Sequence, residues 1–193
     1  MFVKEGPIKR MLKEAWKGVG LRIANDNDGL LFTGRSWYMY VFREYFPKEL
    51  LGAVISMTGE IPVPSMQVLY NKEEAQTELY MADPSYAVYK RALEAEAEDN
   101  AAERTDIIIL DIHEWPYRIY TDSMAQVYAV PERIAEMIEP GICEPNEDYH
   151  GCFALKDGWL YWVSDYMAFG FASHMANDEV RGRAMKLKEA GIV

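Results

Sequence analysis

Short runs of β-forming residues, joined in pairs by turn-forming residues, recur along this chain and restrict it to a fold that contains hairpins. The clearest turn is 25–29, Asn-Asp-Asn-Asp-Gly, in which Asp-Gly is a common hairpin dipeptide. Further turns are predicted at 121–123 and 156–158. Hairpins join antiparallel neighbours, so we expect a mainly antiparallel sheet. The predicted strands are 21–24, 30–33, 36–42, 66–70, 105–112, 116–120, 125–130, 151–155, 159–163 and 166–172.

Helices are expected to flank this sheet. Most of the candidate segments begin near a proline or a capping residue and carry apolar residues at the i, i+3, i+4 spacing of a helix face. The predicted helices are 7–18, 47–57, 83–103, 131–138 and 177–190. The sequence therefore predicts an α+β fold, with a mixed, mainly antiparallel sheet built from hairpins and four to five flanking helices.

A single domain over 1–193 suits a chain of 193 residues. Two lobes, 1–82 and 105–193, joined by an acidic helix at 83–104, are the alternative.

The run 107–110 is apolar at every position, which predicts a strand buried on both faces. A faint repeat of strand, turn, strand, proline and helix relates 32–50 to 120–134. Common supersecondary structure explains this repeat, whereas a true duplication would indicate a clamp-like oligomeric scaffold.

The chain is strongly acidic, with 31 acidic and 20 basic residues and a formal net charge of −11, yet half of its residues are hydrophobic. Such a hydrophobic content excludes a disordered acidic tail. The negative charge argues against direct binding of nucleic acid over a broad face, which would have to be positive. Acidic residues are concentrated in 83–114 and 132–148, while 1–22 carries six basic and two acidic residues.

These acidic segments predict a surface that meets a basic partner, although an ordinary solvated surface is the alternative. In such a contact the carboxylates would stand in for phosphates, and association would be fast and salt-sensitive. The candidate binding residues are Glu94, Glu96, Glu98, Asp99, Glu103, Glu136, Glu139, Glu144, Glu147 and Asp148.

Aromatic residues are dense at 37–40 and 159–162. Stacking on nucleic-acid bases would require neighbouring basic residues, and Lys156 is the only one close to the second group. We therefore expect both groups to pack in the core, with a protein-binding surface as the alternative.

Catalytic and metal-binding candidates are few. Asp111 and His113 would face the same way at the end of a strand, as an acid–base pair or joint ligands of a divalent ion in a metal-assisted hydrolase. A structural polar pair is the alternative, since no nucleophile accompanies them. Cys143, His150 and Cys152 could bind zinc, but their spacing matches no standard motif. We expect no cofactor, and binding in preference to catalysis.

The location is predicted from what the sequence lacks. Two cysteines are too few for a disulfide framework, and 1–20 contains no apolar segment like that of a signal peptide. No apolar run approaches the length of a membrane span. These features predict a soluble cytoplasmic protein with no membrane partner.

Three segments resemble a loose group of uncharacterised proteins from phages and mobile elements of gut Firmicutes. They are 50–62 (LLGAVISMTGEIP), the strand-to-helix unit 127–138, and the turn 157–159 (DGW). The resemblance implies a mobile-element setting and carries over no activity or catalytic residue. With the acidic charge, it leads us to expect a small protein that binds and modulates a basic host protein. An anti-CRISPR or other counter-defence inhibitor of a nucleic-acid-binding nuclease is the concrete form, and a homodimer is an additional expectation.

Overall fold

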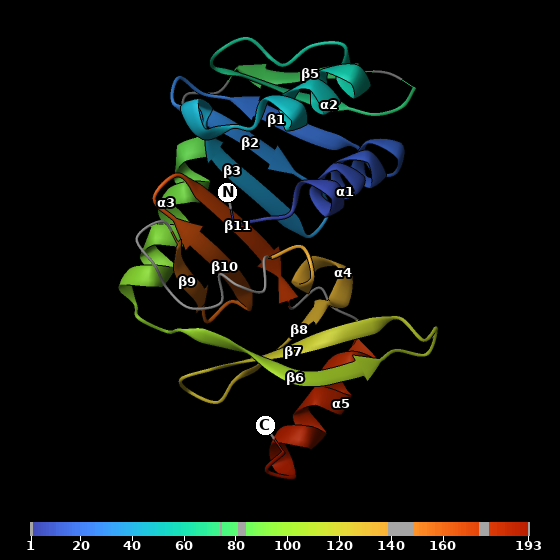
Figure 1. The fold of residues 1–193 in the computed structure, drawn as a ribbon, viewed down its shortest axis with the longest axis vertical. Coiled ribbons are helices and arrows are strands. Elements are labelled where there is room, and N and C mark those ends of the chain that lie inside the picture. Colours follow the sequence, from blue (N-terminus) through green and yellow to red (C-terminus); the bar gives the residue numbers. More distant parts are fainter. Residues whose placement is uncertain (1, 74, 81–83, 139–148, 174–177, 193) are drawn as a thin grey trace.

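An eight-stranded antiparallel sheet forms the centre of the computed structural model (Figure 1), which describes residues 2–73, 75–80, 84–138, 149–173 and 178–192. In spatial order its strands are β5 (Ala75–Tyr80), β4 (Met66–Tyr70), β1 (Leu21–Asn25), β2 (Gly29–Thr33), β3 (Trp37–Phe42), β11 (Met167–Ala172), β10 (Trp159–Ser164) and β9 (Tyr149–Ala154). The pairing of β3 with β11 places Met39 opposite Phe169. One sheet thus takes strands from both sides of 83–104, so the proposed lobes 1–82 and 105–193 do not form separate sheets.

A smaller antiparallel sheet lies next to the large one (Figure 1). Its strands are β6 (Ala102–Leu110), β7 (Pro116–Asp122) and β8 (Val127–Pro131), in that order. The predicted hairpin at 116–130 corresponds to β7 and β8, with Tyr120 opposite Tyr128. The turns that join the strands of both sheets follow the turn-forming residues, because these favour the tight backbone conformations that hairpins need.

Five α-helices lie within the described ranges, which confirms the predicted α+β class. They are α1 (Glu5–Lys17), α2 (Lys48–Thr58), α3 (Pro84–Ala97), α4 (Glu132–Ala135) and α5 (Asp178–Glu189), and a 3₁₀ turn, η1, spans Arg43–Tyr45. On one face of the large sheet, α1 and α2 bury Ile8, Leu12, Leu50 and Val54. On the other face, α3 buries Tyr89, Ala92 and Ala95.

The alternation of side chains along the strands divides the core between the two faces of the large sheet. Phe32, Met39 and Phe169 pack on the α1–α2 side, whereas Tyr40 and Tyr161 pack on the α3 side. All five side chains are fully buried. Helices cover both faces, so these strands are apolar at successive positions. The predicted core packing of the two aromatic groups is confirmed.

Two predictions about local structure are wrong. The helix predicted over 83–103 ends at Ala97, because buried Asn100 directs the chain into β6 by donating hydrogen bonds to the Asp122 carboxylate and the Ala154 carbonyl. The run 107–110 is not buried on both faces, since Ile108 and Leu110 are 45% and 48% exposed. β6 is an edge strand, and α5 covers one face of the small sheet, where it contacts the alternate residues.

One further difference concerns a strand at the edge of the large sheet. β5 is not among the predicted strands, and it extends the large sheet beyond β4. In the described part of the chain, no helix combines the length and the apolar character needed to cross a lipid bilayer.

Candidate anion-binding groove

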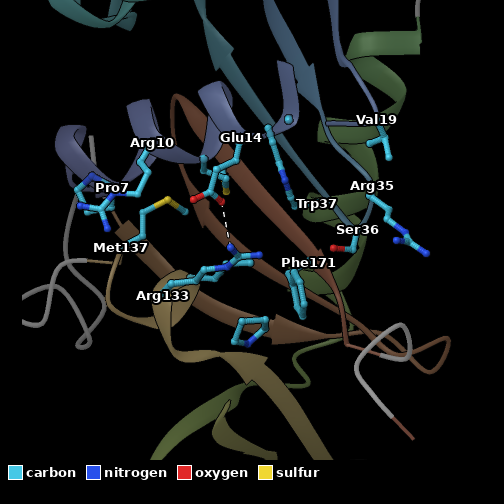
Figure 2. Close-up of a pocket in the computed structure, with 14 residues that line it drawn as sticks. Pro7, Arg10, Glu14, Val19, Arg35, Ser36, Trp37, Arg133, Met137 and Phe171 are labelled. Atoms are coloured by element: carbon cyan, nitrogen blue, oxygen red, sulfur yellow. Dashed lines mark hydrogen bonds and ion pairs between the residues drawn. The ribbon is translucent and has the colours of Figure 1, made fainter. Parts of the chain in front are cut away.

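A groove of about 310 Å³ lies between α1, the β2–β3 turn, β11 and α4 (Figure 2). Arginine residues from three separate segments line it. Figure 2 shows Arg133 near the middle, Arg10 at one end beside Pro7, and Arg35 at the other end beside Val19 and Ser36. The lining residues are Pro7, Arg10, Met11, Glu14, Ala15, Val19, Arg35, Ser36, Trp37, Pro131, Arg133, Ile134, Met137 and Phe171.

The helical repeat of α1 places Arg10 and Glu14 along the groove. Ile8 and Leu12 are fully buried against the large sheet, which fixes the rotation of the helix about its axis. Residues four positions apart lie on the same side of a helix, so Arg10 and Glu14 are neighbours on the side that faces the groove.

The β2–β3 turn carries Arg35 and depends on Gly34. A Cβ atom on Gly34 would lie 2.4 Å from Nε1 of Trp37, so only glycine lets the indole lie against this turn. The Gly34 N–H donates to the Trp37 carbonyl at 3.0 Å and closes the turn. The Trp37 side chain thus lines the groove while Arg35 stays exposed at its end.

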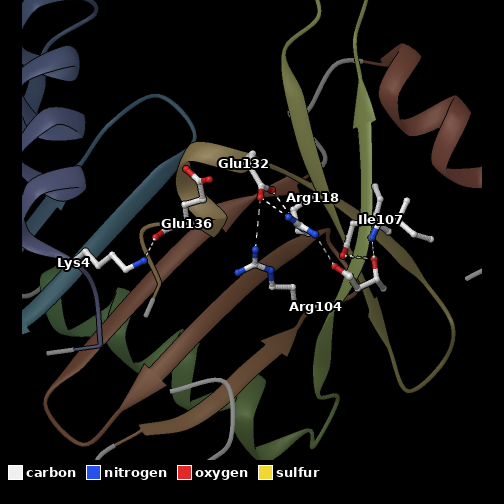
Figure 3. A network of polar contacts seen from close by, with 8 residues as sticks. Lys4, Arg104, Ile107, Arg118, Glu132 and Glu136 are labelled. Atoms are coloured by element: carbon white, nitrogen blue, oxygen red, sulfur yellow. Dashed lines mark hydrogen bonds and ion pairs between the residues drawn. The ribbon is translucent and has the colours of Figure 1, made fainter. Parts of the chain in front are cut away.

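Arg133 is positioned through the residue before it. The Glu132 carboxylate accepts hydrogen bonds from Nε and one terminal nitrogen of Arg118 on β7, at 3.0 and 2.5 Å, and lies 3.6 Å from the guanidinium of Arg104 (Figure 3). The side chains of Glu132 and Arg118 are only 10% and 11% exposed. Because a buried, bidentate pair is geometrically restrictive, it holds α4 on the small sheet and directs Arg133 toward the groove.

The charges in the groove are unequal in number. Glu14 forms an ion pair with Arg133 at 2.9 Å, and both side chains are at least half exposed. Among the described residues, no carboxylate pairs with Arg10 or Arg35. The groove therefore holds three guanidinium groups and one carboxylate, an excess of two positive charges in a chain whose net charge is −11.

Apolar side chains form the floor of the groove. Trp37, Ile134, Met137 and Phe171 are all less than 10% exposed, and Val19 at the rim is 66% exposed. An apolar floor with a few charged groups at the rim is typical of small-molecule sites. A second hollow of about 260 Å³ shares Val19 and Arg35 with the groove and is also lined by Arg22, Gly20, Thr33, Gly34 and Leu69.

The predicted acidic residues are only partly brought together. Glu94, Glu98, Asp99 and Glu103 are exposed at the end of α3 and the start of β6, and no basic residue of the described ranges pairs with them. Glu136 follows α4, on a different part of the molecule, where its carbonyl accepts a hydrogen bond from Lys4 (Figures 1 and 3). The remaining predicted residues lie outside the described residues: Glu139, Glu144, Glu147 and Asp148.

The sixth described member of the predicted acidic set is bound within the protein. Glu96 lies 2.9 Å from Nδ1 of His150, whose Nε2 lies 2.9 Å from the Asp165 carboxylate. Burial lowers the pKa of His150, but these two carboxylates outweigh burial, and the pKa is raised above its ordinary value. The His150 ring on β9 thus lies between a carboxylate of α3 and a carboxylate of the β10–β11 turn.

The predicted Asp111–His113 pair lies in the β6–β7 turn. One oxygen of Asp111 accepts hydrogen bonds from the backbone N–H groups of His113 and Trp115, at 2.8 and 2.9 Å. Asp122 forms the same pattern in the β7–β8 turn, with the N–H groups of Met124 and Gln126. These bonds give Asp111 a turn-forming role, and the exposed His113 side chain is not needed for it.

The predicted zinc ligands are not assembled in the described residues. Cys143 lies outside them, Cys152 is half-buried, and the two ring nitrogens of His150 each lie 2.9 Å from a carboxylate oxygen. Within the ranges that the structure describes, no three His, Cys, Asp or Glu side chains are arranged to hold a metal ion.

The sequence indicated one part of the groove. The basic segment 1–22 contains Arg10, but Arg35 and Arg133 join it only through the packing of α1, β3 and α4. No protein-family model matches this chain, and no curated protein does either. The chemistry of the groove is therefore the basis for a functional interpretation.

Proposed function

We propose that this chain is a binding protein that holds an anionic ligand in the groove between α1 and α4. The supporting observation is that arginines from three segments line one concave surface of a protein with a net charge of −11. The overall charge repels anions at long range, so only a local excess of positive charge can attract one. The planar guanidinium groups of Arg10, Arg35 and Arg133 suit carboxylates and phosphates.

The proposal can be tested by ligand-induced thermal stabilisation. The probes are benzoate, hexanoate, hexanedioate and phenyl phosphate, compared with sodium chloride at equal ionic strength. A ligand that binds only the folded state raises the melting temperature. We expect at least one probe to do so in the natural protein. The effect should disappear in the triple variant Arg10→Gln, Arg35→Gln, Arg133→Gln, and persist in Arg181→Gln, which changes an exposed arginine of α5.

The contrary result is equally specific. If every probe changes the melting temperature of the triple variant as much as that of the natural protein, the groove does not bind small anions. Charged hydrogen bonds contribute about 1.5–3 kcal/mol each, so the loss of even one arginine should weaken binding by roughly 10-fold or more.

We propose as a second function that the chain binds a basic protein through the carboxylates at the end of α3 and the start of β6. The exposed side chains of Glu94, Glu98 and Asp99 support it, at the end of α3, on the opposite side of the large sheet from α1, and exposed Glu103 follows at the start of β6. In the mobile-element setting that the resemblance implies, the partner is a nucleic-acid-binding nuclease such as a CRISPR effector. This function also implies a cytoplasmic location.

This second function is tested by binding to a basic CRISPR nuclease at low and high salt. We expect binding at low salt that weakens as salt screens the charges, and a loss of binding in the variant Glu94→Gln, Glu98→Gln, Asp99→Asn. The triple arginine variant should bind as the natural protein does. An absence of binding at low salt would end this proposal.

A further inference from the structure

We infer that the groove is built for an elongated ligand with two anionic ends and an apolar middle, such as a linear dicarboxylate. This inference rests on the proposed binding of an anion in the groove and adds the chemical class of the ligand. It follows from where the unpaired charges lie, not from their number alone.

The uncompensated charges are at the ends of the groove. Glu14 already accompanies Arg133 near the middle, at 2.9 Å (Figure 2). Arg10 lies at one end and Arg35 at the other, and neither pairs with a carboxylate of the described chain. A ligand that neutralises both must carry two separated anionic groups.

A monoanion has less to gain at the middle of the groove. At Arg133 it would share the guanidinium with the Glu14 carboxylate, whose negative charge opposes it. The two charges of a dianion can instead reach Arg10 and Arg35 while the Glu14–Arg133 pair stays intact. The groove should therefore favour dianions over monoanions by more than the statistical factor of two that equivalent ends provide.

The apolar floor determines the nature of the segment between the two anionic groups. Trp37, Ile134, Met137 and Phe171 are buried and present little polar surface between the two ends. A polymethylene chain gains from leaving water over such a floor, whereas a strongly hydrated middle would lose its water without replacement bonds. A groove of about 310 Å³ lies at the small end of the range for ligand pockets, which favours a small molecule.

The test compares the dissociation constants of linear monocarboxylates and dicarboxylates of four to ten carbons, measured by calorimetry at one ionic strength. We expect an optimum chain length at which the dicarboxylate binds about 10-fold more tightly than the monocarboxylate, the effect of one additional charged contact. In Arg35→Gln and in Arg10→Gln, this preference should fall to about the statistical factor of two.

Two variants of α1 examine the role of Glu14. Glu14→Gln frees Arg133, so it should tighten the binding of monocarboxylates and reduce the preference for dicarboxylates. Glu5→Gln is the matched control, because Glu5 also forms an exposed ion pair from α1, with Lys9 at 3.0 Å, but does not line the groove. It should leave both affinities unchanged.

The outcomes separate the two levels of the proposal. Equal binding of both acids, with no optimum length, overturns the inference about a double-ended ligand and leaves the proposed anion binding intact. If no carboxylate of either series and none of the other anionic probes binds, both proposals are overturned together.

Discussion

Replacement of Glu132 by Gln leaves the guanidinium of Arg118 buried without its counter-ion. The two side chains are only 10% and 11% exposed, and the pair is bidentate. Loss of one partner of a buried pair costs about 3–5 kcal/mol, because the remaining charge stays poorly solvated. We expect the low end of that range, since the Gln carbonyl can still accept one hydrogen bond. For a domain of this size, a loss of about 3 kcal/mol lowers the melting temperature by roughly 6–12 °C.

The measurement is urea denaturation followed by circular dichroism, with stability obtained by linear extrapolation. Glu14→Gln is the comparison, because it breaks an ion pair whose side chains are at least half exposed. Such an exposed pair contributes only about 0–1 kcal/mol to the free energy of unfolding. A double variant, Arg118→Met with Glu132→Leu, should recover much of the lost stability, since it leaves no buried charge unpaired. If Glu132→Gln costs no more than Glu14→Gln, the buried pair does not hold α4 in place.

Two further predictions concern a histidine and a pair of glycines. Because two carboxylates raise the folded-state pKa of His150 above 6.5, its stabilising effect should be complete below that pH and decline as the pH rises through the raised value. Unfolding free energies measured from pH 5.5 to 8.5 should show this decline, and a His150→Gln variant that declines equally would refute it. Gly170→Ala should destabilise by about 1–3 kcal/mol, because the new Cβ would lie 2.5 Å from the buried Tyr38 ring. Gly182→Ala, with open space around it in α5, should instead stabilise by up to about 1 kcal/mol in the same denaturation assay.

Local turn chemistry made the hairpins predictable. The Asp-Gly step at 28–29 and the turn at 156–158 are recognisable without knowledge of distant contacts, and the strands on either side follow from them. β5 was not predicted, because its sequence, Ala-Gln-Thr-Glu-Leu-Tyr, has no run of apolar residues and its placement depends on pairing with β4. An edge strand held by a single neighbour leaves a weak signal in the sequence.

Burial depends on layers that the sequence does not reveal. The run 107–110 is as apolar as β10 or β11, yet α5 packs against the face of β6 that carries Ile107 and Ile109, so Ile108 on the other face remains 45% exposed. The groove was not predicted for a related reason. Its three arginines, Arg10, Arg35 and Arg133, lie in segments that are far apart in the chain. Only the packing of α1 and α4 beside β3 and β11 brings them together.

The most direct test of the groove is a titration with hexanedioate in which the NMR chemical shifts of the arginine side-chain Nε–H groups are measured. We predict that the signals of Arg10 and Arg35 shift with a common dissociation constant while that of Arg181 on α5 does not move. If the Arg10 and Arg35 signals stay fixed while the ligand binds elsewhere, or if all the arginines shift equally with ionic strength, the groove is not the anion site.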